Sequence, residues 1–410
     1  MLADAIGQAF GNMRAHVGRT VLTLFGIVWG TALVILLVAW GTGLRDTLVE
    51  QASSGGRRMI LFFPGRSSSG VGADRGGRQI RLKRDDARLV ASALPHLPHV
   101  TAGVMRWGGV YVRYRSEFRN VTTFGVEPEA APIMELVPTR GRFFEMHDLV
   151  QHRRVAVLGA ELKKRLFGAG GALGERIEVS GVGYEVIGVL ARKGDQISSL
   201  GPPDDQKLFL PLTTYQTLIA GDEYVNFIGI APRSSDDHHA VTDQVRKVLG
   251  ARHGFAADDR DALTVFDVVN FIDLFRNLTT VIRVFVAAVG IVTLAIGGVG
   301  VMNILLLAVT ERTAEIGLRK AVGATRADIV RQFLVEALFI TGVGGVMGMA
   351  LGLGLCAAAG DQGPVHVASF VSWWIVVGSA ALLGAVGIAA GVWPALRAAS
   401  IDPVRALRYQ

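Results

Sequence analysis

The charged side chains best placed to do chemistry stand in one short stretch, residues 310–340, between two long apolar segments. Glu315 precedes Arg319 by four residues, which is the favourable order for an ion pair on one helix face. Gly323 follows as a stop, because the residue just past a helix end often needs a positive φ. The stretch therefore predicts a helix over about Glu311–Val322 and a break after it.

A second helix is predicted directly after this break. Thr325 and Asp328 form a T-x-x-D start, a capping box in which Asp replaces the usual Glu, and the helix runs on into the next apolar segment. A short helix, a glycine break and a capped long helix make a rigid elbow. Such an elbow could pass force from a soluble partner to membrane helices. On physical grounds alone, a basic loop that only fixes the topology is an equal alternative.

The sequence lacks the common motifs of nucleotide-binding and hydrolytic sites. It contains no G-x-x-x-x-G-K-[ST] phosphate loop, no H-E-x-x-H zinc motif and no G-x-S-x-G nucleophile motif. Residues 236–239 (DDHH) have metal-binding side chains, but four adjacent residues on a helix point in different directions, which favours a solvated helix start. Glu336 is a carboxylate inside an apolar span near its cytoplasmic end. Pairing with a nearby arginine is favoured there over an ion pathway, which needs polar groups near the midplane.

The composition indicates a membrane protein. Half of the residues are hydrophobic and only 19% are charged, whereas soluble chains are nearer a quarter charged. The one cysteine, Cys356, excludes a disulfide framework and a Cys-based metal site. The net charge is +7, but residues 44–277 hold 31 Lys and Arg against 28 Asp and Glu, and most other basic residues flank apolar runs. That distribution indicates membrane topology and argues against a nucleic-acid partner.

Four apolar segments are long enough for the roughly 20 residues that cross a bilayer. The first is uncharged and longer than the apolar part of a cleaved signal peptide. The fold expected is a membrane protein with four α-helical spans and a large α+β extracytoplasmic domain between spans 1 and 2. The predicted parts are an N-terminal amphipathic cytoplasmic helix (1–20), the first span (21–43), the outer domain (44–277), the second span (278–309), the cytoplasmic coupling elbow (310–332), the third span (333–360), a short external loop (361–370), the fourth span (371–396) and a cytoplasmic tail (397–410).

Within the outer domain, short runs of β-branched and aromatic residues predict strands, and periodic apolar residues predict helices. A Gly-, Ser- and Arg-rich piece between Ser53 and Arg78 predicts a mobile loop. Strands are predicted at Met59–Phe63, Gly109–Arg115, Phe118–Val126, Val155–Leu158, Ile177–Val179, Tyr184–Val189, Leu208–Leu210 and Val225–Ile230, and helices at Asp85–Leu94, Ala160–Phe167, Thr213–Ile219 and Asp237–Leu249.

Glycines recur every four residues on the third span, at Gly344, Gly348 and Gly352. Stripes of small residues let membrane helices approach closely, so these glycines are interpreted as helix-packing devices and not as ligand sites. The same spacing occurs at Gly26 and Gly30 in the first span and at Gly387 and Gly391 in the fourth.

Basic residues gather in the elbow and near both termini, and the loop between the third and fourth spans has none. Cytoplasmic segments carry the excess of Lys and Arg in membrane proteins. Both termini and the elbow are therefore expected in the cytoplasm, and the domain of residues 44–277 outside it.

The elbow closely resembles the signature of the MacB/FtsX-like ABC transporter permeases, E-x-x-x-E-I-G-x-x-[KR]-A-x-G-A-[ST]. The C-terminal PALRAASIDPVRALRY is similar to the tail of the same family. Residues 141–212 are similar to its extracytoplasmic domain, in which a subdomain, here about 138–215, is inserted into a module formed by the flanks. The signature residues are Glu311, Glu315, Ile316, Gly317, Lys320, Ala321, Gly323, Ala324 and Thr325.

The resemblance implies the permease subunit of an ABC transporter in the bacterial inner membrane, MacB-type and without a fused ATPase domain. It implies no enzymatic residues and no cofactor in this chain, since ATP and Mg would be bound by a separate ABC ATPase subunit. ATP-driven closure of ATPase chains docked on the elbow would move the outer domains and drive export or extraction of a substrate, a mechanism called mechanotransmission. The residues expected to form the ATPase-coupling surface are Glu311, Glu315, Gly317, Arg319, Lys320 and Gly323.

Several alternatives remain open at this point. The chain could instead be an FtsX-like transmembrane signalling or scaffold protein that activates an extracytoplasmic hydrolase or sensor. It could form a homodimer or a heterodimer with a sister permease, with or without a periplasmic adaptor protein. The sequence does not choose among drugs, peptides and lipoproteins as substrates.

Overall fold

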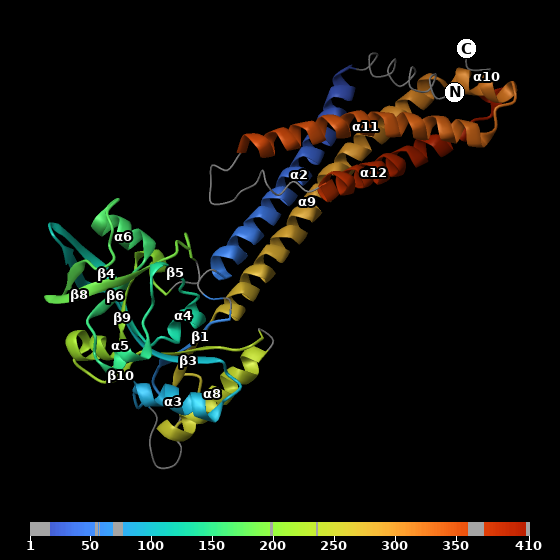
Figure 1. The fold of residues 1–410 in the computed structure, drawn as a ribbon. Helices are drawn as coiled ribbons and strands as arrows, with labels where there is room; N and C mark the ends of the chain where they lie inside the picture. Colours follow the sequence, from blue (N-terminus) through green and yellow to red (C-terminus); the bar gives the residue numbers. More distant parts are fainter. Residues whose placement is uncertain are drawn as a thin grey trace. The chain divides into compact units, whose positions relative to one another are not determined.

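The computed structural model describes residues 17–53, 56, 58–68, 77–196, 200–234, 237–359 and 373–406 (Figure 1). The chain divides into two compact units, Leu48–Phe275 and the combination of Met1–Thr47 with Arg276–Gln410. The first is called the outer unit below and the second the helical unit. The predicted amphipathic helix lies outside the described residues except for positions 17–20. The predicted external loop (361–370) also lies outside them, as do residues 54, 55, 57 and 69–76 of the predicted mobile loop.

The outer unit is built on one large mixed sheet. Within the described residues it has ten strands in the order β12-β1-β11-β3-β4-β9-β6-β8-β5, with β7 pairing with β3 and β8, and β2 and β10 form a separate pair. The strands are β1 Ile60–Pro64, β2 Leu82–Lys83, β3 His99–Tyr114, β4 Glu117–Val126, β5 Pro138–Gly141, β6 Val155–Leu158, β7 Arg176–Val179, β8 Val182–Leu190, β9 Leu208–Pro211, β10 Tyr224–Val225, β11 Phe227–Ala231 and β12 Leu263–Asp267.

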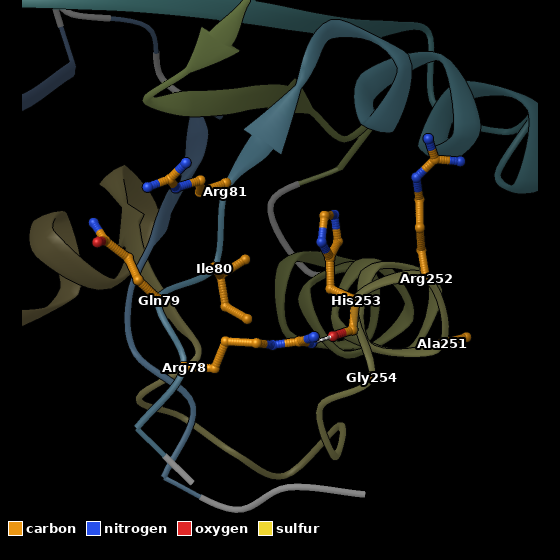
Figure 2. A pocket seen from close by; sticks show the side chains of 8 residues that line it. All are labelled: Arg78, Gln79, Ile80, Arg81, Ala251, Arg252, His253 and Gly254. Atoms are coloured by element: carbon orange, nitrogen blue, oxygen red, sulfur yellow. Dashed lines mark hydrogen bonds between the residues drawn. The ribbon is translucent and has the colours of Figure 1, made fainter. Parts of the chain in front are cut away.

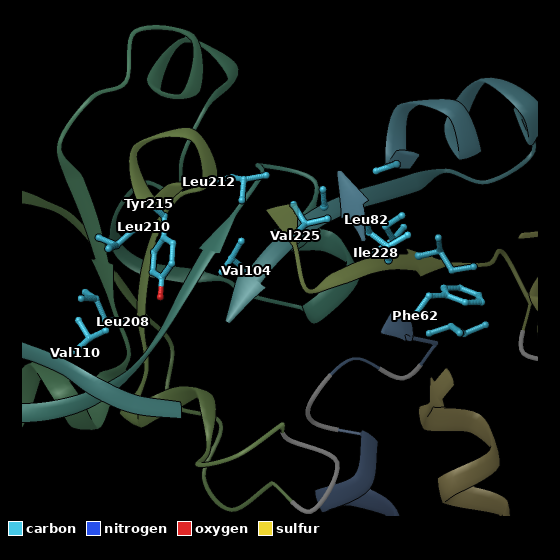
Figure 3. Close-up of a cluster of buried hydrophobic side chains, with 14 of the residues drawn as sticks. Phe62, Leu82, Val104, Val110, Leu208, Leu210, Leu212, Tyr215, Val225 and Ile228 are labelled. Atoms are coloured by element: carbon cyan, nitrogen blue, oxygen red, sulfur yellow. The ribbon is translucent and has the colours of Figure 1, made fainter. Parts of the chain in front are cut away.

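Alternation of side chains along the strands builds two cores, one on each face of the sheet. In β1, Ile60 and Phe62 enter one buried cluster and Leu61 enters the other, as expected because successive strand residues point to opposite faces. In β9, Leu208 and Leu210 likewise lie in the first cluster, part of which is drawn in Figure 3. Burial on both faces explains why these strands read as unbroken apolar runs rather than as alternating ones.

Helices complete each core. Helices α3, α6 and α8 contribute Val90, Leu162 and Val245 to the first cluster, and α4 and α5 contribute Ile133 and Leu149 to the second. The bounds are α3 Arg84–Ala93, α4 Ala130–Met134, α5 Met146–Val150, α6 Ala160–Phe167, α7 Leu212–Tyr215 and α8 His238–His253, with a 3-10 turn at Asp204–Gln206 and a π turn at Gln216–Ala220.

Predicted and observed elements agree best where the pattern is regular. β6 and α6 coincide with the predicted bounds, and each of the other predicted strands and helices overlaps an observed element. β3, however, begins at His99, ten residues before the predicted start. Its first half was missed because Gly108 and Gly109, with φ of 73° and 72°, interrupt the strand pattern at an irregularity in the β3–β4 pairing. Strands β5 and β12 were also missed.

A buried cluster of charges holds the segment before β9 against the sheet. The carboxylate of Asp204 accepts hydrogen bonds from Lys207 Nζ at 2.8 Å, Lys193 Nζ at 2.9 Å and Gln196 Nε2 at 3.2 Å. Burial by itself would raise the pKa of Asp204, but the positive charges of Lys207 and Lys193 outweigh it and lower this pKa to about 2. Because the carboxylate has nearly complete partners, it stabilises the fold only as long as it stays ionised.

The variant Asp204→Asn should lower the free energy of unfolding at pH 7 by about 3–5 kcal/mol, because two lysines lose their buried counter-charge. Since the pKa falls from 3.8 to about 2 on folding, this stabilisation is present above about pH 4 and disappears as the pH drops towards 2. The difference in Tm between wild type and variant, measured by circular dichroism in mild detergent, should therefore narrow over that interval. Asp85→Asn is the control, because its ion pair with Arg88 is exposed, and equal Tm values for all three proteins at pH 7 would contradict the prediction.

The helical unit contains, within the described residues, four helices long and apolar enough to cross a membrane. They are α2 Val17–Ser53, α9 Val268–Glu311, α11 Arg326–Ala359 and α12 Trp373–Ala399. Pro394 lies inside the last of them, which continues to Ala399. Together with the outer unit, these helices confirm the predicted fold class.

Glycines bring α2 into close contact with α9 and α11. An added Cβ on Gly26 would lie 3.6 Å from the Cα atom of Gly297, and one on Gly344 would lie 2.9 Å from Ile27 Cγ2. At Gly348 a Cβ would come within 2.7 Å of the Val28 carbonyl oxygen, a backbone atom. On the same helix, Gly354 has no described atom within 4 Å of such a position.

These two glycines form a matched pair for a packing test. Gly348→Ala should separate α11 from α2 and lower the Tm of the protein in detergent by several degrees, because a methyl group cannot share space with a backbone carbonyl. Gly354→Ala should leave the Tm unchanged or raise it slightly, since alanine favours helix over glycine. A similar Tm for both variants would show that the stripe does not set the helix spacing.

Candidate functional site

The elbow consists of a short helix, α10 (Thr313–Ala321), set between α9 and α11. The first helix was predicted over about Glu311–Val322, but Glu311 is the last residue of α9 and the chain turns at Arg312. Beyond α10, Gly323 has a φ of +109°, a value that side chains strongly disfavour. The glycine stop therefore lies at its expected position.

The start of α11 carries the predicted capping pair. Thr325 donates its hydroxyl to Asp328 Oδ2 at 2.5 Å, and the Asp328 amide donates to Thr325 Oγ1 at 3.2 Å. The Thr325 amide donates to the same carboxylate at 3.0 Å. These bonds satisfy amides that lack partners in the first turn of a helix, so α11 begins at a defined residue.

Two of the six predicted coupling residues face the protein itself. Lys320 Nζ donates to the backbone oxygens of Ala399 at 2.9 Å and Ile401 at 2.5 Å, at the C-terminal end of α12, where a cation is favoured by the helix dipole. Gly317 is buried, and a Cβ there would come within 2.4 Å of Ala406 Cβ in the short helix α13 (Pro403–Ala406). Both residues anchor α10 to the end of α12 and to α13.

Arg319 links the elbow to α11. Its guanidinium donates to Glu315 Oε1 at 2.6 Å, the predicted ion pair, and to Gln332 Oε1 of α11 at 2.7 Å. The Glu315 side chain remains 43% exposed. The structure thus places Arg319 between an exposed carboxylate and the following membrane helix.

Four exposed side chains lie along the elbow: Glu311 at the end of α9, Glu315 and Leu318 three residues apart on α10, and Val322 directly after α10. Glu311 and Glu315 are exposed, and Leu318 and Val322 are 55% and 82% exposed. We call Glu311, Glu315, Leu318 and Val322 the elbow face; Gly323, also exposed, adjoins it. The two apolar members were absent from the predicted site, although their spacing from Glu315 is the signal that could have found them.

The cluster at residues 236–239 has a structural role in the part that is described. Asp237 and His239 are exposed, but His238 is buried, with its Nδ1 atom 2.5 Å from Asp267 Oδ2. Asp267 also accepts the Val269 amide at 2.8 Å, at the start of α9. Among the described residues no group of three or more His, Cys, Asp or Glu side chains is placed to hold a metal ion.

A basic groove of about 460 Å³ lies between residues 78–81 and the end of α8 (Figure 2). Its charges have partners within the protein. Arg252 and His253 pair with the buried carboxylate of Asp86 at 2.6 and 3.0 Å, and Arg78 donates to the His253 carbonyl. Arg81 lies over the ring of Tyr224 at 5.1 Å. We interpret the groove as the boundary between two packed segments and not as a ligand-binding site.

Two family models match the chain. The MacB-like periplasmic core domain matches residues 20–248, and the FtsX-like permease C-terminal domain matches residues 287–403. The macrolide export ATP-binding/permease protein MacB of Bdellovibrio bacteriovorus is 30% identical over all of this chain and 62% of its own length. The protein of the same name from Neisseria meningitidis is 33% identical over 98% of this chain and 60% of its own length. The chain thus spans about three fifths of these relatives.

Solved structures of outer domains are also similar to parts of the chain. The periplasmic region of MacB from Actinobacillus actinomycetemcomitans matches 55% of this chain and 95% of its own, with a TM-score of 0.43 and 19% identity. The extracellular domain of the transporter YknZ from Gram-positive bacteria matches 50% of this chain and 98% of its own, with a TM-score of 0.41 and 20% identity. On the family models, which cover most of its length, this chain belongs to the family of MacB-like permeases with an FtsX-type C-terminal domain.

Proposed function

We propose that this chain is the permease subunit of an ABC transporter, and that an ABC ATPase docks on the elbow face. The observation that carries the proposal is an exposed, partly apolar face on a helix that is itself firmly held. Leu318 and Val322 give a partner an apolar contact, and Glu311 and Glu315 give it charge. Large exposed apolar side chains rimmed by polar ones are typical of protein-binding surfaces.

The anchoring of α10 makes this face suitable for passing on force. Lys320 joins it to the end of α12, and Arg319 joins it to Gln332 of α11. A partner that pushes on the elbow face would therefore displace two membrane helices together. In this proposal ATP and Mg are bound by the partner ATPase, and both termini and the elbow lie in the cytoplasm.

Helix α9 offers a continuous route from the elbow to the outer unit. Its 44 residues extend from Val268, which packs in the second core of the outer unit, to Glu311 of the elbow face. At 1.5 Å per residue such a helix is roughly 65 Å long. ATP-driven movement of the elbow would shift α9 and so act on a substrate outside the cytoplasm. The names of the curated relatives suggest export, and a permease dimer and a periplasmic adaptor belong to the same proposal.

The test begins with the ATPase that co-purifies with the tagged chain from its native membrane. Glu315→Lys and Leu318→Asp should each remove this ATPase from the purified sample and abolish the permease-stimulated part of ATP hydrolysis. Glu315→Lys places a second cation beside Arg319, and Leu318→Asp replaces an apolar side chain of the elbow face with a negative charge. Membrane insertion should be unchanged, because the native side chains lie at the exposed surface of α10.

Glu161→Lys is the matched control. Glu161 forms the same type of ion pair with Arg165, four residues later on α6 of the outer unit, at 3.1 Å. It should keep both the bound ATPase and the stimulated hydrolysis. If the two elbow variants also keep them, the docking assignment is wrong. If the wild-type chain brings down a cell-wall hydrolase or a sensor instead of an ATPase, the signalling alternative takes its place.

A further inference from the structure

Behind the elbow lies a buried carboxylate that the docking surface does not use. The side chain of Glu336 on α11 is 1% exposed. Its neighbours on the helix, Phe333 and Ala337, belong to a buried apolar cluster shared with Val309 of α9 and Ile316 of α10. A carboxylate in such surroundings is costly unless its charge and its hydrogen bonds are both satisfied.

Glu336 is only partly satisfied in this structure. The guanidinium of Arg312, at the turn between α9 and α10, has its Nη1 atom 3.9 Å from Glu336 Oε1, beyond the 2.7–2.9 Å usual for charge-assisted hydrogen bonds. Neither carboxylate oxygen makes a hydrogen bond of normal geometry to the residues that the structure describes. The two charges are thus close enough to attract each other, but the guanidinium and the carboxylate do not form a direct hydrogen bond.

A polar row connects this carboxylate to the elbow face. Gln332 precedes Glu336 by one turn of α11, and its side-chain oxygen accepts a hydrogen bond from Arg319. Arg319 in turn holds Glu315, whose side chain is exposed. The row therefore runs from a predicted contact of the ATPase to a buried charge in the helix bundle.

We propose that docking on the elbow face presses α10 and its preceding turn against α11, so that Arg312 closes onto Glu336 and locks the bundle in its ATP-driven arrangement. This inference rests on the proposed function and adds a positioning residue to it. Buried ion pairs gain most of their stability from good geometry and complete hydrogen bonding. Arg312 and Glu336 therefore have two arrangements, one separated and one hydrogen-bonded, and a small movement of the turn converts one into the other.

The experiment measures two quantities for each variant in nanodiscs: the amount of bound ATPase, and the ratio of permease-stimulated to basal hydrolysis. Glu336→Gln keeps the size of the side chain and removes its charge. It should leave the ATPase bound and reduce the stimulation about tenfold, within the usual range of coupling between two sites. Arg312→Gln should have the same effect, and Arg312→Lys should retain most of the stimulation.

The double variant Arg312→Gln/Glu336→Gln should be no worse than either single variant, because residues that act through one contact are not additive. Thr341→Val is the matched control. Thr341 is also buried on α11, and its hydroxyl donates to the Ala337 carbonyl of its own helix. This variant should keep both binding and stimulation.

Each outcome decides a separate point. If Glu336→Gln binds the ATPase and stimulates it normally, or if the single effects simply add, the inference is wrong and the proposed function stands. If Glu336→Gln loses the ATPase as Glu315→Lys should, Glu336 supports docking rather than transmission, and the inference is also wrong. If Glu315→Lys and Leu318→Asp both retain the ATPase, the docking assignment of the proposed function fails. Where Glu336→Gln does not insert, Arg312→Gln, which lies in a partly exposed turn, supplies the same test.

Discussion

Lipid offers no hydrogen-bond partner to a polar group, so a polar side chain within a membrane-spanning segment is stabilised mainly by partners inside the protein. Hydroxyl groups do so on their own helices, as Thr31 and Thr341 donate to the carbonyls of Ile27 and Ala337 one turn earlier. Backbones can approach closely because glycines line the contacts. Charged side chains gather instead at the elbow, where Lys320 satisfies carbonyls at the end of α12. The elbow is therefore polar and yet closely tied to the apolar helices around it.

The two units treat buried charge differently. In the outer unit, Asp204 accepts hydrogen bonds from three donors at 2.8–3.2 Å, which hold the segments that carry them in one position. In the helical unit, Glu336 has a cation at 3.9 Å, and its oxygens make no hydrogen bond of normal geometry to the described residues. A buried carboxylate with all its hydrogen bonds formed favours a single conformation, whereas one with hydrogen bonds still to form is compatible with two conformations. This difference agrees with an outer unit that keeps its shape and a bundle that changes.

The two family models meet the chain on either side of the boundary between the units. The match to a periplasmic core domain ends at residue 248, within the outer unit, and the match to an FtsX-like permease domain begins at residue 287, within α9. The helix α9 contributes residues to both units and contains no break from Val268 to Glu311.

Local sequence patterns determined much of this protein. Apolar length predicted the four spans, the turn residues Gly323, Thr325 and Asp328 predicted the elbow, and runs such as Val155–Leu158 predicted strands. The tertiary structure decided what local patterns do not contain. Gly317 and Lys320 read as surface residues but face the C-terminal segment, about eighty residues away in sequence. Leu318 and Val322 are apolar but exposed. A helix pattern shows which residues share a face, but only the packing of distant segments decides which face is covered.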